Sequence, residues 1–168
     1  MSINNFRSVA FHECKSDSDC PSAYPSCDRG ICIQERSYVD TSNDLPRCWE
    51  KQVEPQDKLC GYYAVKTVLC TLGIVSESYT HEDFVHDAFS SPHDFPMEPP
   101  YCVGLLVTVL ETRFHKSKST HFTQTLSNGE ISLSPRAIIL GNDAHWKAFV
   151  KKLAWYNMDS LLPNGPQR

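Results

Sequence analysis

Three residues that lie far apart in the chain could together activate a thiol: Cys60, His145 and Asp159. Cys60 opens the segment LCGYYAVKTVLCTLG, whose apolar spacing predicts a helix over residues 59–73. A thiol attacks as the thiolate, and the free N–H groups at the start of a helix favour that negative charge. His145 starts an alternating strand and Asp159 ends the next strand of a predicted hairpin, so the carboxylate can reach the imidazole. The pattern therefore predicts Cys60 as nucleophile, His145 as general base and Asp159 as the group that orients the histidine.

Three neighbours of this set are candidates for substrate contact. Gly61 follows the nucleophile and removes side-chain bulk beside the sulfur. Trp146 follows the histidine and is expected either to line the cleft or to pack in the core. Asn142 is predicted to be a turn residue, with a supporting role in the site as the alternative.

The chain has eight cysteines, and five of them lie in its first 48 residues: Cys14, Cys20, Cys27, Cys32 and Cys48. The spacing C-x5-C-x6-C-x4-C contains no C-x2-C pair, which disfavours zinc. The segment HECKSDSDCPSAYPSCDRGICI instead resembles small extracellular disulfide modules, in which four cysteines allow three pairings. Cys70 lies in the middle of the predicted helix and is expected to be a core thiol. One free nucleophile leaves an odd number of cysteines, so either Cys60 is bonded or another thiol is free as well.

In the second part of the chain, predicted helices are followed by predicted strands. Further helices are predicted over 80–89, with Thr80 as N-cap and Asp83 at the third helical position, and over 103–114, where a buried strand is the alternative. A proline-rich loop over 91–101 separates them, and strands are predicted at 137–140, 145–150 and 153–158. The order indicates an α+β domain over 48–168, in which the helix carrying the nucleophile packs on a small antiparallel sheet, preceded by a cysteine-rich, loop-dominated extension over 1–47.

Composition narrows the expected partners. The net charge of −4 is not offset by any basic run, which argues against nucleic acid. No run approaches the roughly 18 apolar residues of a membrane span. No pattern for a metal or a cofactor is present, and none is expected. Residues 1–10 contain no signal-peptide core, which predicts a cytoplasmic protein; disulfides among the N-terminal cysteines would predict a secreted one instead.

Two segments carry a family resemblance. WYNMDSLLPNGP at 155–166, with HWKAF before it, and CWEKQ…LCGYYAVKTVL at 48–69 resemble the corresponding segments of Josephin-domain deubiquitinases. The resemblance implies a papain-like fold, a Cys60–His145–Asp159 triad and ubiquitin or a ubiquitin-like protein as substrate. It also implies an oxyanion-hole glutamine before the nucleophile, for which the chain offers Gln56, slightly favoured, and Gln52. The long helical arm that holds ubiquitin in the family has no counterpart, because the proline-rich loop stands in its place.

Two other functions fit the same residues. One is a processing peptidase similar to the double-glycine leader peptidases, which share the Cys, His, Asp order. The other is a secreted, disulfide-rich binding protein on an inactive papain-like scaffold, in which Cys60 would be bonded to another cysteine.

Overall fold

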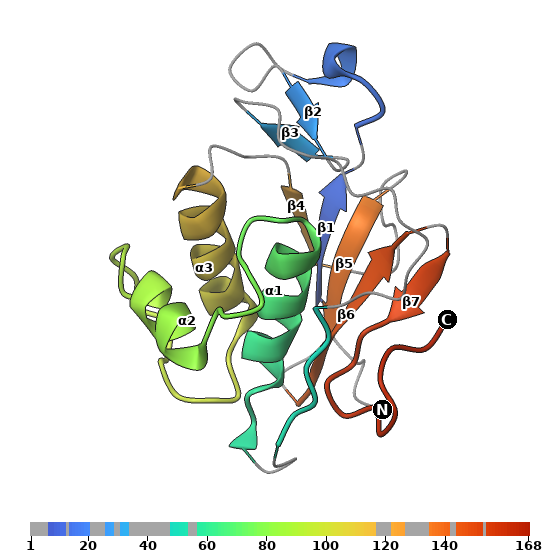
Figure 1. Ribbon diagram of the computed structural model, residues 1–168. Coiled ribbons are helices and arrows are strands. Elements are labelled where there is room, and N and C mark those ends of the chain that lie inside the picture. Colours follow the sequence, from blue (N-terminus) through green and yellow to red (C-terminus); the bar gives the residue numbers. More distant parts are fainter. Residues whose placement is uncertain are drawn as a thin grey trace.

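A computed structural model describes residues 7–12, 14–20, 26–28, 31–33, 48–53, 57–116, 122–126, 135–141, 144–152 and 154–168. Its three α-helices lie on one side of an antiparallel sheet, with α1 packed on the sheet and α2 packed on α3 (Figure 1). The helices are α1 (Cys60–Thr71), α2 (His81–Ala88) and α3 (Val103–Lys116). The larger sheet has five strands in the order β4-β1-β5-β6-β7, with bounds β1 Arg7–His12, β4 Phe122–Leu126, β5 Pro135–Gly141, β6 Trp146–Lys151 and β7 Trp155–Asn157. The predicted α+β class is confirmed.

Helix α1 is buried on almost every side. All its residues from Cys60 to Cys70 are buried, including the predicted stripe of Ala64, Val65, Val68 and Leu69. It packs on β6, whose inward side chains alternate with outward ones as a half-buried strand requires. A helix enclosed in this way holds the residue at its first turn in a fixed place relative to the sheet.

The other two helices follow their sequence signals. Thr80 caps α2, because its side chain accepts a hydrogen bond from the N–H of Asp83 while the Asp83 carboxylate accepts one from the N–H of Thr80. The apolar run from Val103 forms a helix and not a strand. Residues 91–101 contain no helix or strand, as predicted for a proline-rich loop. None of the helices among the described residues is long and apolar enough to cross a membrane.

One strand of the sheet comes from the region predicted as an extension. Strand β1 lies between β4 and β5, where Arg7 is opposite both Leu126 and Gly141. The boundary placed after residue 47 therefore does not separate the extension from the sheet. The physical reason is the short run SVAFH, which is apolar enough to fill a gap in a sheet but too short to stand out beside the cysteines.

The rest of the cysteine-rich segment lies apart from the helices. It contains a 3-10 turn, η1 (Asp17–Asp19), and a hairpin of β2 (Ser26–Asp28) and β3 (Ile31–Ile33). In Figure 1 this hairpin lies beyond the upper end of β1, whereas α1 begins at the lower end of the molecule. The small module and the first turn of α1 are therefore at opposite ends of the structure.

Candidate active site

Cys60 is the first residue of α1, as predicted, and its thiol is free. The residue is 3% exposed and belongs to the core cluster. The turn before it is closed by Asp57, whose Oδ1 accepts the backbone N–H of Leu59 over 2.8 Å. The sulfur thus lies where the unpaired N–H groups of the helix concentrate positive potential.

Strand β6 brings a second hydrogen-bond donor to the sulfur. The backbone N–H of Trp146 donates to Cys60 Sγ over 3.4 Å. The Trp146 ring is buried, and its Nε1 donates to the carbonyl oxygen of Tyr101 over 2.8 Å. Trp146 is therefore a core residue whose backbone N–H contacts the sulfur. Of its two predicted roles, its ring packs in the core and does not line a cleft.

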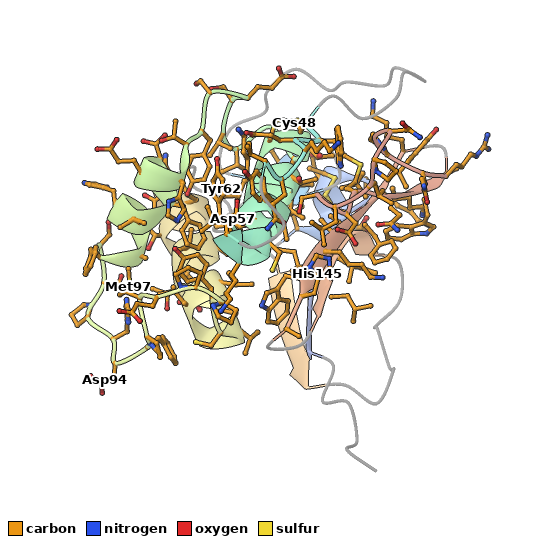
Figure 2. All side chains as sticks on the ribbon, turned by 90° about the horizontal axis from the view of Figure 1, so that it is seen from below. Cys48, Asp57, Tyr62, Asp94, Met97 and His145 are labelled. Atoms are coloured by element: carbon orange, nitrogen blue, oxygen red, sulfur yellow. A yellow bond between two sulfur atoms is a disulfide. The ribbon has the colours of Figure 1, made fainter. Side chains whose placement is uncertain are left out.

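His145 lies between the thiol and Asp159. Its Nε2 is 2.9 Å from Asp159 Oδ1 and 3.0 Å from Oδ2. The histidine also shares a hydrogen bond with the Cys60 side chain. The structure thus brings together the three residues that the sequence analysis named, and in the view from below His145 lies beside the start of α1 (Figure 2).

These contacts shift the proton affinities of the two acid–base groups. The hydrogen bond to Asp159, with a further one to Cys60, raises the pKa of His145 to about 9 against the opposing effect of burial. Burial alone would raise the pKa of Asp159, but the hydrogen bonds from His145 and from the N–H of Leu161 outweigh it and lower that pKa. At neutral pH the pair is therefore an imidazolium and a carboxylate, and the imidazolium faces the sulfur.

Asp159 is held by the segment that precedes α1. Trp49 Nε1 donates to the Asp159 carbonyl oxygen over 2.9 Å, and the Gln52 N–H donates to the Ser160 carbonyl oxygen over 2.9 Å. Ser160 Oγ donates in turn to Gln52 Oε1 over 3.0 Å. The sequence analysis missed these roles of Trp49 and Ser160; the signal was present in CWEKQ and DSLL, the two segments that carry the family resemblance.

Of the two candidates for the oxyanion-hole glutamine, Gln52 is the one that lies among the described residues. It is 3% exposed, and its Nε2 donates to Asp57 Oδ1. Gln56, the slightly favoured candidate, and Asn142 both lie outside the described residues. Gly61 directly follows Cys60 and is buried, and a Cβ there would face core side chains, 3.0 Å from Leu106 Cδ2 and 3.5 Å from Trp146 Cδ1. Its role in substrate contact stays a prediction.

The cysteines correct the expectation for Cys70 and identify the two free thiols. Cys70 is not a core thiol, because it forms a disulfide with Cys48. A mid-helix cysteine gives no sign of its partner when that partner lies in a loop. Cys60 and Cys102 are free, so the alternative in which Cys60 is bonded is wrong, and the other free thiol required by the odd count is Cys102.

The N-terminal cysteines are oxidised. Cys14 and Cys27 form a disulfide, and Cys20 is disulfide-bonded as well. The sulfur atoms of these three cysteines lie within 4.8 Å of one another, a spacing that would suit a metal. Cysteine binds a metal as the thiolate, which a disulfide-bonded sulfur cannot form. This cluster is therefore a pair of crosslinks and not a metal site.

Comparison with known proteins matches one part of the chain. The model of the Magi 5 toxic peptide family matches residues 8–35, which hold β1, η1 and the β2–β3 hairpin. No curated protein matches the chain, and no solved structure does.

Proposed function

We propose that this protein is a thiol-dependent hydrolase that cleaves a peptide or isopeptide bond with Cys60, His145 and Asp159. One observation carries the proposal: a free cysteine at the first turn of a buried helix is hydrogen-bonded to a histidine that pairs with a carboxylate. The free sulfur, the N–H donor beside it and the raised pKa of His145 all suit a pair made of a cysteine nucleophile and an imidazolium.

The chemistry follows from that resting pair. The Cys60 thiolate attacks the carbonyl carbon and forms a tetrahedral oxyanion, and the His145 imidazolium gives its proton to the leaving amine as the C–N bond breaks. A thioester remains on Cys60. His145, now neutral, takes a proton from water, whose oxygen attacks the thioester carbon. The C–S bond then breaks, so the acid is released, the sulfur of Cys60 is freed and His145 is again an imidazolium. Asp159 keeps Nε2 directed away from the sulfur throughout.

An oxyanion needs donors that are in place before it forms. The Cys60 backbone N–H at the helix start is one donor. Gln52 is the other that we propose, because its amide is buried and fixed at both ends, by Ser160 and by Asp57. This choice reverses the slight preference for Gln56.

We further propose a papain-like fold of the Josephin type, with a substrate that ends in glycine, such as ubiquitin or a ubiquitin-like protein. The support is the resemblance of segments 48–69 and 155–166, together with their hydrogen-bonded contact through Trp49, Gln52 and Ser160. Glycine suits this site because Cys60 is itself 3% exposed, so only a narrow chain can reach it.

An electrophilic ubiquitin probe with a C-terminal warhead tests nucleophile and substrate together. We expect one covalent adduct, which is lost in Cys60→Ala and retained in Cys102→Ser, the matched variant at the other free thiol. A His145→Gln variant should label far more slowly. If the probe fails but a Gly-Gly peptide is cleaved in a Cys60-dependent way, the function is that of a double-glycine processing peptidase. If the protein neither reacts with the probe nor cleaves the peptide, the proposal that it is a hydrolase is wrong.

A second function is favoured by the match of residues 8–35 to a toxic peptide family. We propose that this crosslinked segment binds a partner of its own. Its oxidised cysteines meet the condition under which we expect a secreted protein, because disulfides persist in oxidising compartments. The test compares the toxicity of the purified native protein with that of Cys60→Ala. Equal toxicity would mean that this segment causes it, and toxicity lost in the variant would mean that the hydrolase causes it.

A further inference from the structure

The short loop before α1 contains a carboxylate that contacts both the proposed oxyanion donor and the helix of the nucleophile. The Oδ1 atom of Asp57 accepts two hydrogen bonds, one from Gln52 Nε2 and one from the backbone N–H of Leu59. Leu59 directly precedes Cys60 and is the N-cap of α1. One oxygen atom therefore links the glutamine amide to the first turn of the helix.

The chemistry of these groups allows a single orientation of the amide. An ionised carboxylate only accepts hydrogen bonds, so the end of the amide that faces Asp57 has to be the nitrogen. The Ser160 hydroxyl donates to the oxygen end. A flipped amide would put Oε1 against the Asp57 carboxylate and lose the bond to it, in a place where Gln52 is 3% exposed.

We propose that Asp57 is a positioning residue that turns the Gln52 amide nitrogen toward the oxyanion and keeps it in register with Cys60. This inference rests on the proposed function. Asp57 touches no reacting atom. It acts through Gln52, and its bond to Leu59 ties the amide to the helix that carries the sulfur. In the view from below, Asp57 lies over the start of α1 (Figure 2).

A double-mutant cycle on the full-length protein separates positioning from mere capping of the helix. The variants are Gln52→Ala, Asp57→Ala and the combination of both. Each is measured for hydrolysis of ubiquitin carrying a C-terminal aminocoumarin and for alkylation of Cys60 by iodoacetamide, which forms no oxyanion. We expect Gln52→Ala to lower kcat about 100-fold and Asp57→Ala about 10-fold, with KM little changed. In the Gln52→Ala background, Asp57→Ala should have no further effect.

Two variants serve as controls. Asp57→Asn keeps an oxygen acceptor at the same place and should recover most of the loss caused by Asp57→Ala. Asp94→Ala removes an exposed carboxylate at the far edge of the proline-rich loop and should leave hydrolysis at the native rate (Figure 2). Alkylation of Cys60 should stay within about twofold of native in all of these variants, because the thiol and His145 are untouched.

The outcomes distinguish this inference from the proposed function. The inference is wrong if Asp57→Ala hydrolyses at the native rate, if its loss is equally large without Gln52, or if alkylation falls as much as hydrolysis. A native protein that neither hydrolyses the coumarin substrate nor cleaves a Gly-Gly peptide would overturn the proposed function, and this inference with it.

Discussion

The backbone N–H of Trp146 donates a hydrogen bond to the sulfur of Cys60. Because the donor belongs to the residue directly after His145, a shift of β6 would move the sulfur's main-chain partner and its acid–base partner together. The bond also does not depend on the protonation of the imidazole. In the proposed reaction it therefore keeps a donor on the sulfur during the step in which His145 is neutral.

Replacing Asp159 with Asn should lower the proton affinity of His145. The carboxylate is the main reason for its pKa of about 9, so the variant's pKa should move toward the ordinary value near 6.5. NMR titration of the His145 ring measures it directly. Cys60→Ala should lower the same pKa by less, since the thiol is the smaller cause. Equal titration of native protein and Asp159→Asn would contradict the pairing.

The same histidine should make stability depend on pH in a defined window. Its folded pKa lies above its unfolded value, so its contribution is complete below about pH 6.5 and is lost as the pH rises to about 9. Between pH 6 and pH 9.5 the native protein should lose about 1–2 kcal/mol more unfolding free energy than His145→Gln, after allowance for partial exposure of the ring. Urea unfolding of both proteins at the two pH values measures the difference, and equal losses would count against the ion pair.

Gly141→Ala should disrupt the site through the main chain. A Cβ there would lie 2.3 Å from the His145 carbonyl oxygen and 2.9 Å from Trp146 Cα, and neither backbone atom can move without moving β6. We expect a loss of roughly 3 kcal/mol or more and slower alkylation of Cys60. Gly104→Ala is the matched control, because the three atoms nearest to its Cβ all belong to the Phe95 ring, a side chain that can swing away. Similar losses in the two variants would argue against the backbone explanation.

Removing the Cys48–Cys70 disulfide should weaken hydrolysis as well as stability. The crosslink closes a loop with a sequence separation of 22 residues, for which chain entropy predicts about 3 kcal/mol. It also anchors the segment whose Trp49 and Gln52 hold the Asp159 turn. Cys48→Ala/Cys70→Ala should therefore lower the hydrolysis rate. Cys14→Ala/Cys27→Ala, in the segment of the β2–β3 hairpin and away from the start of α1, should not, and a comparable drop there would mean that the effect is general (Figure 1).

Local signals in the sequence were sufficient for the helices and for the expectation that Cys60, His145 and Asp159 lie close together. The capping pair of Thr80 and Asp83 and the apolar stripe after Cys60 are short-range patterns, and both appear as predicted. His145 and Asp159 could be paired because a hairpin connects them, with β6 and β7 antiparallel. Each of these inferences depends on residues close in the chain, where spacing alone fixes geometry.

Contacts between residues far apart in the chain could not be predicted from local sequence patterns. The partner of Cys70 lies in a loop before the helix, and no periodicity marks it. The hydrogen bond between Gln52 and Ser160 spans a separation of 108 residues, which no local pattern marks, and the preference for Gln56 stays untested because Gln56 lies outside the described residues. Asp57 was overlooked because a carboxylate in a polar loop looks like a solvated one until its partners are known.

Strand β1 has a consequence for how the chain is made. Its partners on either side are β4 and β5, and Arg7 pairs with Gly141 near the other end of the sequence. During synthesis β1 must wait for its sheet neighbours until residues 122–141 have left the ribosome. A tag or cargo fused ahead of Arg7 would be tethered to the middle of the finished sheet, and trimming the first dozen residues would split that sheet in two.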